Sequence, residues 1–204
     1  MGHGRIHTQT SKDTRRLISL RGNLNVTVFG GAQPKPGSAA YQQAYDLGRL
    51  LAQVGYAVLT GGYIGTMEAV SKGASEAGGH VIGVTCDEIE RWRGTKANPW
   101  VKEERHFTTM QERLNELVRA CDAAIALPGG PGTLTEIALS WNLMIVDSMP
   151  HKLLILVGEG WKTTLNTFMA QLDDYIPEHQ RSLLSFAADI HESVALVNQW
   201  SRNG

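Results

Sequence analysis

The chain alternates between short runs of consecutive apolar residues and longer stretches in which apolar residues recur every three or four positions. The first pattern is typical of buried β-strands and the second of amphipathic helices. The apolar runs predict strands at 24–29, 56–60, 80–85, 101–107, 123–127, 152–157 and 183–186. The helical spacing predicts helices at 38–54, 64–77, 108–121, 132–146, 161–172 and 190–200.

Local signals mark the ends of the first predicted helix and the one segment without a regular pattern. Ser38 is placed as an N-cap and Gly55 as the residue that closes the helix. Residues 87–100 are charged, contain Gly94 and Pro99, and show no clear period, so we expect a long loop. Loops of this length in compact domains tend to be lids or interface segments.

The order of the elements predicts the fold class. Strands that alternate with helices require crossover connections, and these produce a mainly parallel sheet with helices on both faces. We therefore expect a Rossmann-like, doubly wound α/β fold, with residues 24–204 as a single nucleotide-binding domain and residues 1–23 as a polar, basic N-terminal arm. In such folds ligands bind at the carboxyl ends of the strands, where the strand order reverses.

Composition narrows the classes of partner. The chain has 204 residues, of which 42% are hydrophobic, which suffices for one substantial core. Its net charge of −1 gives no reason to expect nucleic acid or a membrane surface as a partner. No apolar run approaches the roughly 20 residues of a membrane span, and the first 23 residues lack the apolar stretch of a secretory signal, so we expect a cytoplasmic protein.

The cysteines and the other potential metal ligands show no familiar spacing. Cys86 and Cys121 lie far apart, without a CxxC pair or a Cys/His pattern, so we expect neither a disulfide framework nor a zinc site. We interpret both as small apolar residues. The sequence gives no reason to expect a metal or another cofactor.

Three glycine-rich turns each follow a predicted strand. They are Gly30-Gly31, then Gly61-Gly62-Tyr63-Ile64-Gly65, and finally Gly129-Gly130-Pro131-Gly132 within PGGPGTLTE (128–136). Glycines let backbone N–H groups approach an anion, and a helix start adds unpaired donors and a partial positive charge. We expect the turns to converge on one crevice that binds phosphate, with the carboxylate of Glu136 close by.

The common nucleotide fingerprints are absent. A P-loop requires GxxxxGK[ST], and no lysine follows these glycines at that spacing. The dinucleotide pattern GxGxxG fails because Tyr63 stands at the position of its second glycine. ATP hydrolysis and hydride transfer therefore lack their usual sequence support.

Three motifs together resemble a known family. GGYIGTMEAVSKGA (61–74), TMQER (109–113) and PGGPGTLTE (128–136) are similar to GGGxxGxM, MxxR and PGGxGTxxE of the LOG family of nucleoside-5′-monophosphate phosphoribohydrolases, in the same order. The resemblance extends from about residue 24 to residue 170. The same fold and PGGxGT loop occur in relatives that only bind nucleotides or a molybdopterin-type cofactor, so a non-catalytic carrier is the alternative.

The resemblance implies a role for each matching residue. Arg113 and Glu136 correspond to the catalytic arginine and glutamate of the family. The 5′-phosphate would bind at Gly129, Gly130, Gly132 and Thr133, with Gly61, Gly62 and Gly65 as the adjoining wall and Gly30 and Gly31 as the remaining turn of the crevice. The implied substrate is a purine nucleoside monophosphate, with N6-modified adenosine monophosphate among the candidates. The family also implies a homodimer or larger homo-oligomer, and no metal or other cofactor.

The two proposed catalytic residues also have structural interpretations. Thr133 and Glu136 stand in the relation T-x-x-E, which is the pattern of a helix capping box. Arg113 could be a solvated helix charge or pair with Glu116, three residues later. Trp92 and Trp100 in the predicted loop would either stack on a base or act as hydrophobic anchors or subunit contacts.

The sequence departs from the family at positions near the proposed site. Leu114 follows Arg113 where active members often have lysine, and Gly31 and Ala32 stand where a serine pair is frequent. Pro131 replaces a frequent tyrosine and has no N–H to offer an anion. A different substrate, or binding without turnover, therefore stays open.

Overall fold

The computed structural model describes residues 24–203, so the predicted arm at 1–23 lies outside the described residues. The strands are β1 (Asn25–Phe29), β2 (Ala57–Thr60), β3 (Val81–Cys86), β4 (Glu103–Phe107), β5 (Ala123–Ala126), β6 (Leu153–Val157) and β7 (Leu184–Ala187). The helices are α2 (Ala39–Gln53), α3 (Thr66–Glu76), α4 (Asp87–Arg93), α5 (Met110–Arg119), α6 (Pro131–Ile145), α7 (Glu159–Gln171), the 3-10 turn η1 (Asp173–Tyr175), α8 (Glu178–Arg181) and α9 (Ile190–Asn203).

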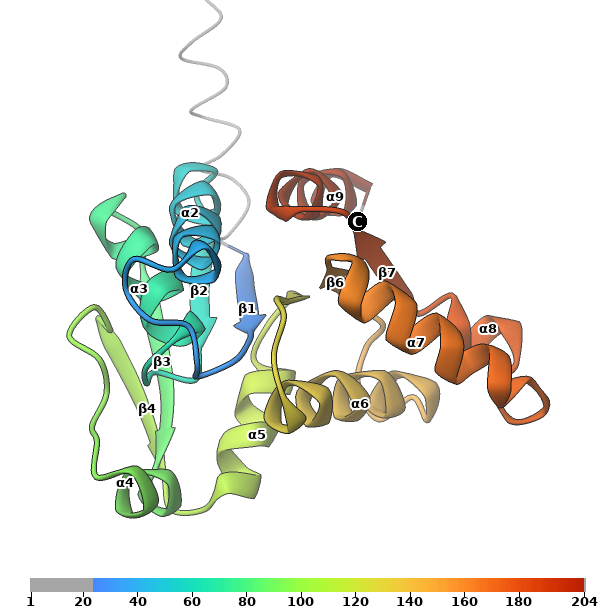
Figure 1. Cartoon of the computed structure of the whole chain (residues 1–204), viewed down its shortest axis with the longest axis horizontal. Coiled ribbons are helices and arrows are strands. Elements are labelled where there is room, and N and C mark those ends of the chain that lie inside the picture. Colours follow the sequence, from blue (N-terminus) through green and yellow to red (C-terminus); the bar gives the residue numbers. More distant parts are fainter. Residues whose placement is uncertain (1–23, 204) are drawn as a thin grey trace, which may run out of the picture.

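All seven strands form one parallel sheet in the order β4-β3-β2-β1-β5-β6-β7. The chain begins at the centre, builds outward to β4, and then crosses back through α5 to place β5 on the other side of β1 (Figure 1). The predicted Rossmann-like, doubly wound α/β fold is confirmed. Its strand order reverses between β1 and β5, which is where such sheets bind ligands.

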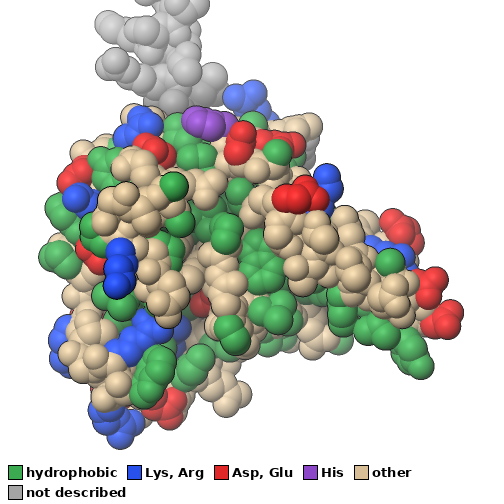
Figure 2. All heavy atoms as spheres, viewed as in Figure 1, with side chains coloured by type: hydrophobic (Ala, Val, Ile, Leu, Met, Phe, Trp, Pro, Cys, Tyr) green, Lys and Arg blue, Asp and Glu red, His purple; other side chains and the backbone are tan. Residues whose placement is uncertain are grey.

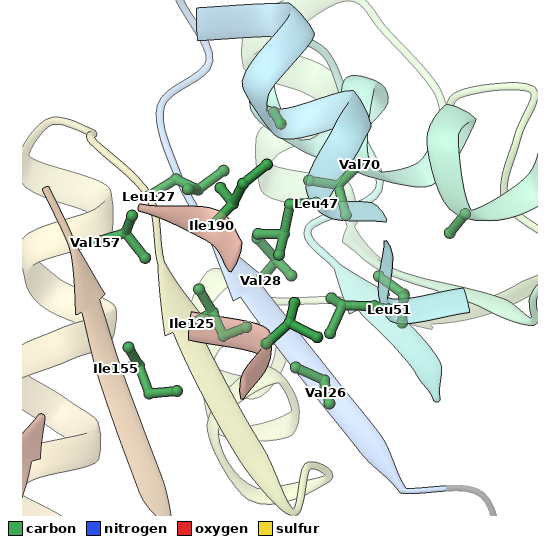
Figure 3. Close-up of a cluster of buried hydrophobic side chains, with 14 of the residues drawn as sticks. Val26, Val28, Leu47, Leu51, Val70, Ile125, Leu127, Ile155, Val157 and Ile190 are labelled. Carbon is green, nitrogen blue, oxygen red and sulfur yellow. The ribbon is translucent and has the colours of Figure 1, made fainter. Parts of the chain in front are cut away.

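Helices cover both faces of the sheet. On one face α2, α3 and α9 pack on side chains such as Val26 and Val28 of β1 and Ile125 of β5, which meet Leu47 and Leu51 of α2 (Figure 3). Helices α5, α6 and α7 pack on the other face. Because successive strand residues point to opposite faces, the central strands need apolar residues at nearly every position, which explains their unbroken apolar runs.

The helix ends follow the sequence signals in part. Ser38 caps α2, its Oγ accepting a hydrogen bond from the N–H of Tyr41 at 3.2 Å, and Gly55 follows the helix with φ of 91°. Both were predicted. The expected helix at 108–121 is shorter, because Thr109 forms the N-cap of α5.

The prediction of a long loop at 87–100 is wrong for its first half, which forms α4. Seven residues are too few to display a helical period. The helix is favoured instead by acidic residues in its first turn and by Arg91 and Arg93 in its last, which complement the helix dipole. Gly94 ends it in the left-handed conformation, with φ of 64°. The short η1 and α8 were not predicted either.

None of the helices within residues 24–203 is both long enough and apolar enough to cross a bilayer. Cys86 and Cys121 are buried as free thiols, which agrees with their interpretation as small apolar residues.

Candidate active site

The three glycine turns meet at the carboxyl ends of β2, β1 and β5, which are neighbours in the sheet. The N–H of Gly31 donates to the carbonyl oxygen of Pro128 at 3.2 Å, which ties the first turn to the third. The N–H of Thr66 donates to the carbonyl oxygen of Gly31 at 3.0 Å, which ties the first turn to the second. The expected convergence of the three turns is therefore observed, at the point where the strand order reverses.

The third turn leads directly into the start of α6. Gly130 is the N-cap and Pro131 the first helical residue, and no side chain caps this end. A Cβ atom placed on Gly130 or Gly132 would meet nothing within 4 Å, and both residues are exposed. The start of α6 is therefore exposed, and its first N–H groups have no side-chain acceptor, as an anion site requires. Pro131 occupies the first helical position, where its missing N–H would have no acceptor within the helix.

The second turn depends on glycine for both conformation and close approach. Gly65 has φ of 73°, and a Cβ atom there would lie 2.6 Å from the carbonyl carbon of Ala32. At Gly61 a Cβ atom would overlap the guanidinium of Arg113 and come within 2.5 Å of the sulfur of Met67. The backbone of this turn therefore packs directly against the arginine.

Arg113 is buried, with 5% of its surface exposed. Its Nε donates to the carbonyl oxygen of Val84 at 2.8 Å and its Nη2 to that of Gly61 at 3.0 Å. The guanidinium also lies over the ring of Tyr63, 5.5 Å from the centroid. Within residues 24–203 no hydrogen bond uses Nη1, which leaves this end of the fork available for a ligand.

The structure excludes the interpretation of Arg113 as a solvated helix charge or as the partner of Glu116. Glu116, the expected partner, accepts a hydrogen bond from Arg105 instead, at 2.7 Å. Burial lowers the pKa of Arg113 from its usual value, and the negative charge of Glu136 opposes this shift. A buried guanidinium held by two carbonyl oxygens needs an anion nearby to balance its charge.

Glu136 lies on α6 and is partly exposed. Burial raises the pKa of its carboxyl to about 7, and the charge of Arg113 opposes the rise. No ion pair links Arg113 and Glu136 within the described residues, so the two groups interact electrostatically while remaining separate. A carboxyl that titrates near neutral pH is suited to general acid–base work.

The capping-box interpretation of Thr133 and Glu136 is wrong. Helix α6 begins at Pro131, so Thr133 lies inside the first turn, and its buried side chain packs against Gly129. The capping box of this region belongs to α5: the Oγ1 of Thr109 accepts from the N–H of Glu112 at 3.2 Å, and the carboxylate of Glu112 accepts from the N–H of Thr109 at 3.0 Å. Glu136 is therefore not engaged in capping.

Comparison with known proteins decides the family. The model described as the SLOG cluster4 family matches residues 23–171. A rice protein (Oryza sativa subsp. japonica) named "Probable cytokinin riboside 5′-monophosphate phosphoribohydrolase LOGL9" is 34% identical over 86% of this chain and 78% of its own length. The chain belongs to the LOG family. The resemblance predicted from the three motifs is thereby confirmed.

Two further proteins are similar to this LOG-family chain, one in sequence and one in structure. The rice protein named "Cytokinin riboside 5′-monophosphate phosphoribohydrolase LOG" is 32% identical over 83% of this chain and 84% of its own length. Among solved structures, the molybdenum cofactor binding protein from the phototrophic bacterium Rippkaea orientalis is 26% identical, with a TM-score of 0.68, over 87% of this chain and 96% of that one.

A cavity of about 480 Å³ adjoins the first two glycine turns of this LOG-family chain. Its lining includes Ala32, Ile64, Gly65, Glu68, Trp92 and Arg93. Trp92 is 77% exposed at α4, and Lys and Arg side chains gather over this end of the molecule (Figure 2). Trp100 does not line this cavity; its ring lies under the ammonium of Lys72, 5.4 Å from the centroid.

The sequence did not indicate that Arg93 lines this cavity or that α4 forms one of its walls. The charge pattern of α4 and the glycine that ends it were the available signals. Leu114 is one of the departures from the LOG pattern, and it packs against the apolar cluster beneath α5. A lysine at this position would have either to bury its ammonium or to extend beyond the cluster into solvent.

Proposed function

We propose that this protein is a nucleoside 5′-monophosphate phosphoribohydrolase. It cleaves the N-glycosidic bond of a purine nucleoside monophosphate with water and releases the free base and ribose 5-phosphate. N6-modified adenosine monophosphates are the first substrates to test, because the rice relatives are named for cytokinin riboside 5′-monophosphates. The observation that carries the proposal is the meeting of an uncapped helix start with a buried arginine and a carboxyl of raised pKa.

The phosphate is assigned to the start of α6. The N–H groups of Gly129, Gly130, Gly132 and Thr133 bind its oxygens, while Gly30, Gly31, Gly61, Gly62 and Gly65 form the walls of the crevice. The partial positive charge of the helix start favours a doubly charged group. Such binding fixes the ribose relative to Arg113 and Glu136, which saves most of the entropy of bringing the reacting groups together.

The catalytic step uses the two charged side chains. Positive charge develops on the ribose ring as the bond between C1′ and the base nitrogen breaks, and the carboxylate of Glu136 stabilises it. Water adds its hydroxyl to C1′ and gives its proton to Glu136, while the base leaves with the electron pair of the broken bond and takes up a proton from solvent. Glu136 then releases its proton to solvent, which restores the carboxylate. Arg113 holds phosphate or ribose oxygens through its free Nη1.

The carrier alternative has its own support. The Rippkaea orientalis protein, which binds the molybdenum cofactor, matches this chain over 96% of its length. Leu114, Gly31 and Ala32 remove polar groups that active LOG proteins often carry. A carrier would use the same crevice to bind its phosphorylated ligand without breaking a bond.

Incubation of the purified protein with a panel of nucleoside monophosphates separates these functions. Chromatography should detect free base from at least one of them. Glu136→Gln and Arg113→Ala should each lower kcat/KM by roughly 100-fold or more, since the loss of a proton-transfer or charge-stabilising group has effects of this order. Glu178→Gln, at an exposed position, and Arg49→Ala, at a partly exposed one, both lie outside the crevice and are the matched controls. Binding of several monophosphates without release of base would favour the carrier.

Two general features belong to the same proposal. We infer cytoplasmic residence and a homodimer, in which exposed apolar side chains on the α6 and α7 side of the molecule supply the contact (Figure 2). The side chains of Leu134 and Phe168 are 44% and 45% exposed there. Apolar side chains grouped on one surface are typical of an interface.

A further inference from the structure

Three potential metal ligands meet outside the glycine crevice, where α4 begins beside the end of β4. The Oδ1 of Asp87 lies 2.9 Å from the Nε2 of His106, and the Oε1 of Glu90 lies 3.8 Å from its Nδ1. One ligand atom from each residue lies within 4.8 Å of the other two. The sequence did not indicate this group, because His106 comes from a different element, 19 residues after Asp87.

Glu90 is the member of this group that needs a partner. Its side chain is 6% exposed, and its Oε1 has no hydrogen-bond partner within residues 24–203. The other oxygen accepts from the ammonium of Lys96. A buried carboxylate oxygen without a partner is destabilising, so native proteins rarely leave one unsatisfied. A cation placed between Glu90 and His106 would satisfy it.

The scaffold around the three residues holds them in place. Asp87 and Glu90 are three residues apart on α4 and therefore share one face of the helix. Behind the imidazole, the Nδ1 of His106 lies 2.9 Å from the hydroxyl of Thr85, which donates to Glu104 at 2.6 Å. Such a hydrogen bond to the rear nitrogen fixes the orientation of metal-binding histidines.

We propose that Asp87, Glu90 and His106 bind a divalent transition-metal ion. The Nε2 of His106 is the nitrogen ligand, and one carboxylate oxygen from each acidic residue completes the set. One imidazole and two carboxylates form a donor set that Zn²⁺ accepts, with bonds of about 2.0–2.2 Å. Ligands on a tetrahedral ion of this size lie about 3.4 Å apart, so the group closes around the ion by small side-chain movements.

The surroundings leave room for a fourth ligand. A cavity of about 520 Å³ opens beside the group and is lined by Asp87, Glu90, Lys96 and Thr108 among others. The ammonium of Lys96 pairs with Glu90 and would compete with a metal ion for this carboxylate. Its side chain is 85% exposed and can move into solvent. Water can then complete the coordination.

The position of the ion indicates what it would do. It joins α4 to β4, and α4 carries Trp92 and Arg93 to the cavity beside the glycine turns. The same helix caps α5, because the carboxylate of Glu88 accepts from the N–H of Met110 at 2.8 Å. The ion would therefore stabilise the wall of the crevice without taking part in the bond cleavage proposed above.

The test is a titration of the full chain with Zn²⁺ after treatment with a chelator and dialysis, by calorimetry and by metal analysis. We expect one equivalent to bind at this site. Glu90→Gln, Asp87→Asn and His106→Gln should each weaken that binding at least tenfold, and Lys96→Gln should strengthen it. His80→Gln is the matched control, because His80 pairs with a single carboxylate, Glu103, at 2.8 Å.

Thermal unfolding supplies a readout that does not depend on activity. Zn²⁺ should raise Tm for the wild type and for His80→Gln but not for Glu90→Gln, whose fold is checked by circular dichroism. The chain has seven histidines, so binding elsewhere would survive His106→Gln. Equal affinity in the wild type and His106→Gln, no binding by the wild type, or weaker binding by Lys96→Gln would overturn the proposal.

Discussion

At the scale of single residues, the site combines two charged groups whose surroundings work against their charges. Burial lowers the pKa of Arg113 and raises that of Glu136, and each charge partly restores the other. Functional sites often contain such pairs, because groups chosen for stability alone would be solvated or paired. The guanidinium donates hydrogen bonds to the carbonyl oxygens of Val84 and Gly61 and lies over the ring of Tyr63. These contacts fix its position without neutralising its charge.

The raised pKa of Glu136 predicts a pH-dependent cost in stability. The folded protein holds this proton up to about pH 7, whereas the unfolded chain releases it near pH 4.5. The stabilising contribution of the protonated form is therefore complete below pH 4.5 and is lost as pH rises through 7. Glu136→Gln should be as stable as the wild type at pH 4.5 and more stable at pH 8, by up to about 3 kcal/mol at roughly 1.4 kcal/mol per pKa unit. Urea unfolding at both pH values measures the difference, and an equal difference at both would contradict the assignment.

A variant at Gly61 tests whether the backbone of the second glycine turn determines the position of the Arg113 side chain. Because a Cβ atom there would overlap the guanidinium, Gly61→Ala should displace Arg113 and lower kcat/KM at least tenfold. Gly160→Ala is the control, since a Cβ atom at this position on α7 meets nothing within 4 Å. Steady-state kinetics of both variants give the comparison. Equal activity of Gly61→Ala and Gly160→Ala would mean that the position of Arg113 is not critical.

At the scale of elements, α5 and α6 differ in how they begin. Helix α5 has a complete capping box at Thr109 and Glu112, which anchors the helix that carries Arg113. Helix α6 has no side-chain cap and begins at Gly130 and Pro131. A bound anion could therefore accept the hydrogen bonds that a side-chain cap would otherwise accept at the start of α6.

The capping box of α5 predicts a measurable loss of stability. Thr109→Ala removes the side-chain acceptor for the N–H of Glu112 and should cost about 1 kcal/mol in the free energy of unfolding. Thr163→Ala is a matched control, because the hydroxyl of Thr163, at an exposed position, donates to the exposed side chain of Glu159 at 3.0 Å. Chemical denaturation of the two variants checks this. A loss in Thr163→Ala as large as in Thr109→Ala would contradict the assignment.

The sequence predicted the strands and the longer helices because their periods reflect burial on one or both sides. It misjudged α4, whose seven residues are specified by end charges and by Gly94 rather than by periodicity. It also left open whether Glu136 caps a helix, because Thr133 and Glu136 show the same T-x-x-E spacing as Thr109 and Glu112, and only the helix start at Pro131 distinguishes the two cases. The Asp87, Glu90 and His106 group could not be predicted, since pairing of β3 with β4 brings it together.

At the scale of the whole molecule, the strand order explains why distant motifs form one site. The crossover that places β5 beside β1 brings PGGPGTLTE next to Gly30 and Gly31, about a hundred residues earlier in the chain. The second turn follows β2, the neighbour of β1 on the other side. Three turns that are distant in the sequence thereby lie together at the carboxyl ends of neighbouring strands.

The proposed homodimer is tested at this scale. Each chain has a mass of 22.3 kDa, so light scattering coupled to size exclusion should give about twice this value. Replacing Phe168 by Glu should weaken the dimer, because a charge would be buried in the apolar contact. Replacing Gln42, which lies on α2 and is exposed, serves as the control. A single-chain mass for the wild type would contradict the proposal.

Cleavage of an N-glycosidic bond in this crevice can be followed by mass spectrometry of the products after single-turnover incubation with an N6-modified adenosine monophosphate. We expect equal amounts of free base and ribose 5-phosphate from the wild type, and intact nucleotide with Glu136→Gln although that variant still binds it. Recovery of the intact, bound monophosphate from the wild type would contradict the claim, and so would equal product formation by wild type and Glu136→Gln.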